Sequence, residues 1–358
     1  MNTIYIRTLK RVNHSVFSVE KGQKIYWDSQ FKKGPLPYSS GQQIKRSILD
    51  KLNSVLNIVP SPTTFVSKVA FKKETLEFDG EGEVYGTCNP VHADQLLGGW
   101  MKAVSGSRVL KRRSPLSISA MTALHPLLAG VNEENLTFDR KDRSNTKVIV
   151  KIKAGNDYRE LSEEEIIEFL ENREKHTSLA SKYIQDQRRA NGLFIQDIAI
   201  DLRRLFCVSL NKLEPEITEE TENLLCENGW EESENVFGRC LVAPKATREK
   251  LIPALANSII NWAITSNQSR TFSLMETLAV SISDNANKIA GSIRAKLSGE
   301  EENKAVPIIE EDLNGVDTFV TLPAAGYIIT KKESADALDK AEQKLIDLMM
   351  AFDYENQL

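Results

Sequence analysis

The sequence contains no apolar run that approaches a membrane-spanning length, although 41% of its 358 residues are hydrophobic. Its first residues, Met1 to Arg7, lack the regions of a secretory signal and alternate polar and apolar side chains as a strand does. The four cysteines are scattered, without metal-ligand or redox spacing. These absences argue against a membrane helix and a disulfide scaffold, and they predict a cytoplasmic protein with reduced thiols.

Motifs of catalysis and cofactor binding are also absent. There is no Walker A loop, dinucleotide fingerprint, HExxH sequence or paired-cysteine zinc signature. Gly80, Gly82 and Gly86 do not have dinucleotide spacing, and hairpin turns explain them better. The histidines are isolated from one another in the sequence: His14, His92, His125 and His176. We therefore expect no catalytic residue, no metal site and no cofactor.

Charge is distributed unevenly along the chain, whose net charge is −4. Residues 1–113 hold 18 Lys and Arg against 9 Asp and Glu, whereas residues 213–240 hold 9 Glu against one Arg. Residues 300–312 are again acidic. A basic portion beside acidic segments favours a polyanionic ligand, and it would also let copies stack basic face against acidic edge.

The stretch from Tyr38 to Arg46 predicts the start of a helix. Ser40 and Gln43 form a capping-box pattern, in which the hydroxyl accepts the Gln43 amide and the Gln43 side chain reaches back. Apolar residues then recur at helical spacing: Ile44, Ile48, Leu49, Leu52, Val55 and Leu56. The polar residues that fall largely off this stripe are Gln42, Lys45, Arg46 and Asn53.

Lys45 and Arg46 oppose the macrodipole at the helix N-terminus, so they do not stabilise the isolated helix. They make sense if an anion binds there, held by the free amides, the dipole and the two side chains. The alternative is a well-capped helix with a solvated polar face.

With catalytic motifs absent, three basic or polar clusters remain as candidates for a functional site. They are Lys45 and Arg46; Arg108, Lys111, Arg112 and Arg113; and Asn267, Gln268, Ser269 and Arg270. These residue types contact phosphate and ribose. One cluster alone is usually solvated surface, but three without a catalytic motif favour a protein that binds a nucleic-acid backbone. Aromatic residues that could stack on bases are few, which indicates binding without sequence readout.

The order of expected elements is strand, helix, strands, helix, strand, interrupted by long insertions. We expect strands or helices at 3–19, 41–56, 193–208, 247–264, 270–283, 318–330 and 332–352. This order is compatible with an α+β domain of the ferredoxin-like, RNA-recognition-motif type. Residues 60–192 form a long excursion, and the acidic segment after Leu210 reads as an inserted arm.

Three stretches of the sequence resemble the CRISPR-associated Cas-seven (DevR) family. They are Ser39-Ser40-Gly41-Gln42-Gln43-Ile44-Lys45-Arg46 after a first strand, Lys111-Arg112-Arg113-Ser114-Pro115-Leu116, and Ser266-Asn267-Gln268-Ser269-Arg270-Thr271-Phe272. The resemblance implies a right hand, with a modified ferredoxin-like palm, a large finger insertion and a thumb. It places the palm at 1–59 and 193–358, the finger at 60–192, and the thumb at about 211–243 or, in competition, 284–316.

The function implied by this resemblance is that of a non-catalytic backbone subunit of a type I Cascade complex. Copies would oligomerise along the guide RNA (crRNA), beside other Cascade subunits, and the target DNA strand would pair with the guide; no membrane is implied. The RNA-binding residues that we expect are Ser40, Gln42, Gln43, Lys45, Arg46, Lys111, Arg112, Arg113, Asn267, Gln268 and Arg270.

Two other classes of protein remain as alternatives. Related type III backbone subunits cut target RNA with an acidic residue between the first strand and first helix, where this chain has Asp28. The glycine-rich loop of those relatives is missing, since Ala324-Ala325-Gly326 is a poor substitute, so the non-catalytic subunit is preferred. A DNA-binding regulator is disfavoured because no helix-turn-helix pattern is evident.

Overall fold

The chain forms two compact units in this computed structural model: a main unit, Met1–Val131 with Ala190–Leu358, and a small unit, Asn132–Arg189. The structure describes residues 1–17, 23–31, 34–72, 75–80, 82–103, 108–139, 147–155, 157–172, 179, 181–264, 272–298 and 304–358. Each unit is described below by itself.

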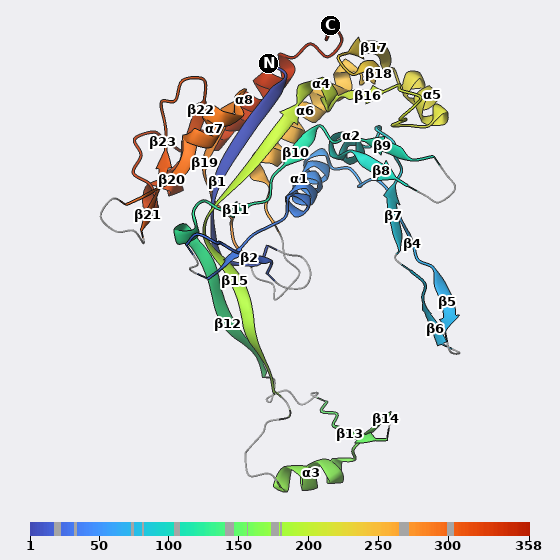
Figure 1. The fold of residues 1–358 in the computed structure, drawn as a ribbon, viewed down its shortest axis with the longest axis vertical. Coiled ribbons are helices and arrows are strands. Elements are labelled where there is room, and N and C mark those ends of the chain that lie inside the picture. Colours follow the sequence, from blue (N-terminus) through green and yellow to red (C-terminus); the bar gives the residue numbers. More distant parts are fainter. Residues whose placement is uncertain are drawn as a thin grey trace. The chain divides into compact units, whose positions relative to one another are not determined.

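The main sheet is organised around β1, which pairs antiparallel with β15 on one side and with β19 on the other (Figure 1). β22 follows β19 antiparallel, β23 adds a parallel edge, and β10, β11 and β12 pair with successive parts of β15. The strands are β1 (Thr3–Ser15), β10 (Leu116–Ile118), β11 (Thr122–Ala123), β12 (Ala129–Asp139), β15 (Ser181–Asp201), β19 (Thr277–Ser283), β22 (Asp317–Thr321) and β23 (Glu333–Ser334).

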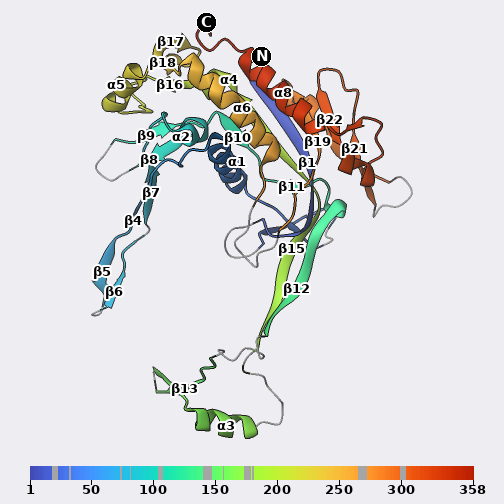
Figure 2. The same ribbon diagram turned by 180° about the vertical axis from the view of Figure 1, so that it is seen from behind.

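One face of this sheet carries the larger core. Because side chains alternate along a strand, Ile4, Ile6 and Val12 of β1 all point to this face, where they are buried. Three helices pack there: α1 (Gly41–Leu56), α6 (Lys245–Asn261) and α8 (Ala337–Met350). α6 contacts both of the other helices, and Figure 2 shows α6 and α8 running beside β1.

The opposite face carries a smaller core that includes Leu9 of β1 and Leu278 of β19. It is covered by elements from the segment that follows β19. These are α7 (Ala286–Ser292), β20 (Ile293–Leu297), β21 (Ala305–Ile309) and the 3-10 turn η2 (Leu322–Gly326). The sheet is therefore buried on both sides along its centre.

The acidic segment after Leu210 is a folded part of the main unit. It follows the one-turn α4 (Leu202–Leu205) and β16 (Cys207–Ser209), and it contains α5 (Glu219–Glu227), β17 (Glu231–Asn235) and β18 (Gly238–Val242). β16, β18 and β17 form a separate antiparallel sheet. Leu225, Trp230 and Leu241 are buried in the larger core, so the expected inserted arm is a packed subdomain whose glutamates, apart from the buried Glu216, lie on its surface.

Short hairpins, turns and one short helix make up the rest of the main unit, before α1, between α1 and β10, and after β11. Most prominent is a narrow two-stranded ribbon that leads away from α2 (Figure 1). The elements are β2 (Ile25–Trp27), β3 (Pro35–Pro37), β4 (Thr63–Val66), β5 (Val69–Lys72), β6 (Thr75–Phe78), β7 (Glu83–Gly86), α2 (Ala93–Gly98), β8 (Trp100–Lys102), β9 (Leu110–Arg112) and η1 (Pro126–Leu128).

The small unit includes one hairpin and one helix: β13 (Lys151–Ala154), β14 (Asp157–Glu160) and α3 (Glu163–Glu171). α3 begins at a complete capping box, because Ser162 accepts from the Glu165 amide and the Glu165 carboxylate accepts from the Ser162 amide. Glu165 also pairs with Arg159 at 2.8 Å. The helix is thus held at its start by local polar contacts.

The α+β class expected from the sequence is confirmed, as are the first strand and the three main helices. β19 begins at Thr277 and is shorter than expected. Among the described residues, no helix is long and apolar enough to span a membrane.

Candidate nucleic-acid interface

The N-terminus of α1 is fixed by a cap and by a close backbone approach. Ser40 Oγ accepts from the Gln43 amide at 3.4 Å, but the return bond of the expected capping box is not formed. A Cβ at Gly41 would lie 2.4 Å from the carbonyl oxygen of Ile118, so only glycine lets α1 start this close to β10. The first turn is therefore held rigidly against the main sheet.

The first turn of α1 is electrostatically open to an anion, because it contains no acidic residue. Gln42 and Arg46 are exposed, whereas Gln43 and Lys45 are half-buried. Burial, and then the positive charge of Arg112, lowers the pKa of Lys45 from 10.5 to about 8. Arg46 pairs with Asp50 one turn later at 3.0 Å, and since both side chains are more than half exposed this pair stabilises little.

The helix also shows where the apolar pattern overestimated burial. Ile44, Ile48 and Leu52 are buried, as expected, together with the polar Asn53. Val55, which was expected on the apolar stripe, is 43% exposed. The buried stripe is therefore narrower than the sequence suggested, and it leaves Gln42 and Arg46 facing solvent.

The run Lys111-Arg112-Arg113 divides between surface and core. Lys111 and Arg113 are exposed, whereas Arg112 is 3% exposed. Arg112 was expected to bind RNA, but in this structure its guanidinium is bonded inside the protein. Successive residues of an extended strand point to opposite sides, which is why a run of three cations cannot all face one ligand.

Arg112 ties together segments far apart in sequence. It donates to the carbonyls of Leu96, Arg204 (2.8 Å) and Cys207 (3.0 Å), and it pairs with the buried Glu216 at 3.7 Å. Burial lowers the pKa of Arg112 to about 10 and raises the pKa of Glu216. The pair joins β9 to the start of the acidic subdomain.

Outside this buried pair, the structure forms a basic cleft that the sequence did not reveal. Four cationic side chains line a cavity of about 850 Å³ together with the ring of Phe237. These cations, which we call the cleft cations, are Arg108, Lys111, Arg113 and Arg204. Arg204 lies on the Phe237 ring, with its guanidinium carbon 3.6 Å from the ring centroid. Sequence inspection missed Arg204 and Phe237 because they are 33 positions apart in the chain.

The first two predicted clusters meet through one buried residue. Lys45 is close enough to Arg112 for the charges to repel, and Arg112 lines a small cavity with Arg113 and Arg204, two of the cleft cations. Lys45 therefore lies near the buried arginine of the second cluster. Asn267, Gln268 and Arg270, the third cluster, lie outside the described residues.

Asp28, the residue of the ribonuclease alternative, has a local structural role. Its Oδ1 accepts from the amides of Gln30 (3.0 Å) and Phe31 (2.6 Å), which closes a turn. Its charge opposes the lowering of the pKa of His125 that burial causes. Among the described residues, no group of three His, Cys, Asp or Glu side chains could hold a metal ion.

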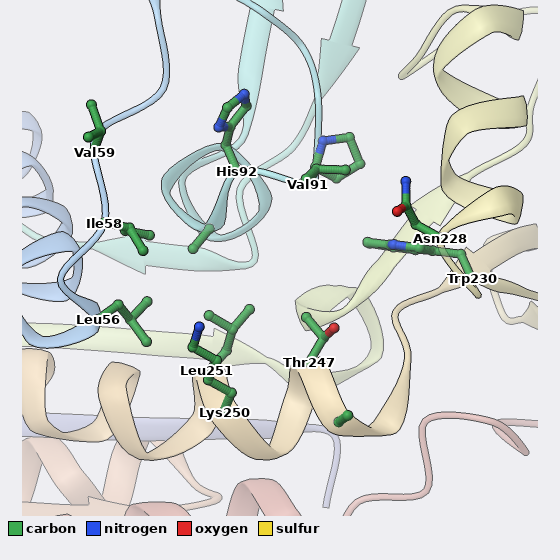
Figure 3. A pocket seen from close by; sticks show the side chains of 13 residues that line it. Leu56, Ile58, Val59, Val91, His92, Asn228, Trp230, Thr247, Lys250 and Leu251 are labelled. Atoms are coloured by element: carbon green, nitrogen blue, oxygen red, sulfur yellow. The ribbon is translucent and has the colours of Figure 1, made fainter.

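A second hollow of about 570 Å³ lies between the ends of four elements (Figure 3). Its walls are mostly apolar and come from the end of α1, the start of α2, the end of α5 and the start of α6. Figure 3 labels His92 and Lys250 among its few polar side chains. None of the predicted RNA-binding residues lines it.

The fold and the site define an α+β protein with a basic cleft and with cationic side chains in the first turn of α1. No family model matches the chain, and no curated protein matches it either. The chain is similar to a subunit in a solved structure titled "CRISPR RNA-guided surveillance complex, pre-nicking", with 10% identity, a TM-score of 0.47, and coverage of 96% of this chain and 100% of that one. It is also similar to a chain of a "CRISPR RNA-guided surveillance complex", with 10% identity, a TM-score of 0.42, and coverage of 96% and 99%.

Proposed function

We propose that the protein is a guide-RNA-binding backbone subunit of a type I CRISPR Cascade complex. The observation that carries the proposal is the capped first turn of α1, which has no acidic residue and carries Gln42, Lys45 and Arg46, with Gln42 and Arg46 exposed. The resemblance of this stretch to the Cas-seven (DevR) family supports the same function. Copies assemble along the guide RNA, beside other Cascade subunits and the target DNA strand.

The right-hand description maps onto the elements as follows. The palm is the main sheet with α1, α6 and α8, and the finger is the region 60–192. The thumb is 211–243 or 284–316. The first thumb candidate packs Leu225 and Trp230 into the larger core, whereas the second contributes α7, β20 and β21 to the opposite face.

The mode of binding follows from the residue types. Amide and cationic side chains at a helix N-terminus contact phosphate and ribose, which position a strand but carry no base identity. Arg112 makes no such contact, because it is buried and bonded within the protein. We therefore assign affinity to Lys45, Arg46, Lys111 and Arg113, with a salt dependence set by the number of phosphates neutralised.

The test is the affinity of the purified protein for a single-stranded RNA, measured by fluorescence anisotropy over a series of salt concentrations. Lys45→Ala/Arg46→Ala should weaken binding and flatten the slope of log affinity against log salt by about 1.4, which is about 0.7 for each lost contact. The matched control is Arg294→Ala/Lys296→Ala on β20, which removes the same charge away from α1. If both double variants leave affinity and slope unchanged, α1 is not in the RNA site.

A further inference from the structure

The cleft beside Arg112 is built for an anion. Its lining includes the four cleft cations but only two carboxylates, Glu214 and Glu216. Glu216 is already neutralised, because it pairs with the buried Arg112 at 3.7 Å and accepts from the Ser209 amide at 2.8 Å. In the part of the chain that the structure describes, Lys111 and Arg113 have no carboxylate partner. The cleft therefore keeps a surplus of positive charge around an empty volume.

The cleft also offers a flat surface of two stacked side chains. Phe237, at the turn between β17 and β18, is 41% exposed. The guanidinium carbons of Arg204 and Arg203 lie 3.6 and 5.0 Å from its ring centroid. Both arginines are held by Asp201, so the stack is fixed before any ligand arrives. Aromatic rings and arginine planes are the surfaces on which unpaired bases stack.

Polar groups at the rim complete the lining. Arg108 donates to the carbonyls of Lys212 and Leu213, which holds its guanidinium across one end of the cleft. Lys111 donates its backbone amide to the Pro215 carbonyl at 3.2 Å, which fixes β9 against the opposite wall. The cations are therefore presented from two segments that are bonded to each other, not from a loose surface loop.

We propose that this cleft binds one or more nucleotides of a single-stranded nucleic acid, with phosphate held by Lys111 and Arg113 and a base stacked on Phe237 and Arg204. The inference rests on the proposed function, which already assigns phosphate contacts to Lys111 and Arg113, and extends it to Phe237 and Arg204. It adds a base contact to a surface that otherwise touches only the backbone. That contact favours unpaired strands without fixing their sequence.

The test compares three polyanions in a binding titration: an oligoadenylate, a polyphosphate of equal charge without bases, and a poly-glutamate peptide. Arg113→Glu should weaken binding of both oligoadenylate and polyphosphate and flatten the salt slope by about 0.7. Phe237→Ala should weaken oligoadenylate about fivefold or more and leave polyphosphate unchanged. Phe237→Tyr keeps a ring at this position and should restore oligoadenylate binding.

The control is Lys296→Glu, an equal charge reversal at an exposed residue of β20, which should leave the affinities unchanged. Melting temperatures of the Phe237 variants separate a lost contact from a misfolded turn. If Arg113→Glu and Phe237→Ala both leave the oligoadenylate affinity unchanged, the proposal that the cleft binds nucleotides is overturned. The proposed function survives that result if Lys45→Ala/Arg46→Ala still weakens RNA binding. Stronger Arg113-dependent binding of poly-glutamate than of oligoadenylate assigns the cleft to an acidic protein segment and also overturns the inference. Absence of RNA binding by the wild-type chain removes the proposed function itself.

Discussion

Replacing Arg112 separates a structural cation from a ligand-binding one. Arg112→Met keeps much of the side-chain volume but removes the partner of Glu216 and the donor to three carbonyls, those of Leu96, Arg204 and Cys207. Leaving one member of a buried ion pair without its partner costs about 3–5 kcal/mol, far more than the loss of an exposed pair. We expect the free energy of unfolding to fall by that amount at neutral pH.

A second variant also removes the charge of Glu216, which Arg112→Met leaves without its partner. Arg112→Met/Glu216→Gln should recover part of the loss, because no ionised carboxylate is then buried alone. The three carbonyls still lack a donor, so a deficit of about 1–3 kcal/mol remains. Urea denaturation of the wild type, the single variant and the double variant gives all three free energies.

The pH dependence of the single variant has a defined sign. Burial already raises the pKa of Glu216, and without Arg112 that rise is opposed only by the hydrogen bond from the Ser209 amide and by the charge of Arg204. A carboxyl whose pKa is higher in the folded protein than in the unfolded chain loses stability as pH rises above the unfolded value, about 4.3. The penalty of Arg112→Met should therefore be small near pH 4 and reach its full value near neutrality.

The effect of Arg112→Met on RNA binding distinguishes a structural role of Arg112 from a ligand-binding one. The salt slope of RNA affinity should be the same in Arg112→Met as in the wild type, at temperatures where both are folded. A variant that keeps its stability while the slope falls by about 0.7 would show that Arg112 contacts phosphate, and it would refute the structural assignment.

Three further predictions concern the neighbouring site. The RNA affinity of the wild type should fall as pH rises through about 8, since deprotonation of Lys45 removes a cation from α1. Lys45→Arg should abolish this fall, and an identical pH profile of affinity in both proteins would contradict the prediction. Gly41→Ala should lower stability by about 1–3 kcal/mol in thermal unfolding, because its Cβ meets the Ile118 carbonyl at 2.4 Å, and unchanged stability would show that the backbone yields. Asp28→Ala should open the turn that Asp28 closes, and neither this variant nor the wild type should cleave target RNA in the presence of magnesium. Periodic cleavage by the wild type that Asp28→Ala abolishes would establish the ribonuclease alternative.

Much of the framework was predictable from periodicity and caps. α1 starts after Ser40, where the cap pattern placed it, and Ile44 and Ile48 are buried as their spacing indicated. α6 spans Lys245–Asn261, close to the helix expected from the apolar pattern. These are local signals, in which a residue and its partners lie within a few positions of one another.

The rest depends on contacts between distant segments. Arg112 is buried because it pairs with Glu216 and donates to carbonyls of three other segments. The sequence of the basic run does not indicate any of these contacts. The stack of Arg204 on Phe237 likewise arises only once β16 and β18 pair. The acidic segment was expected as an arm because its glutamates dominate the composition, yet Leu225 and Trp230 are enough to anchor it in the core.

The most direct test of the central claim is light scattering of the purified protein with single-stranded RNAs of increasing length. A backbone subunit contacts its own kind head to tail, and such a contact repeats along the strand without closing. We predict that the chain is monomeric or heterogeneous without RNA, and that the mass of the complex rises in steps as the RNA lengthens. A fixed stoichiometry at every RNA length would contradict the proposal that this protein is a filament-forming backbone subunit.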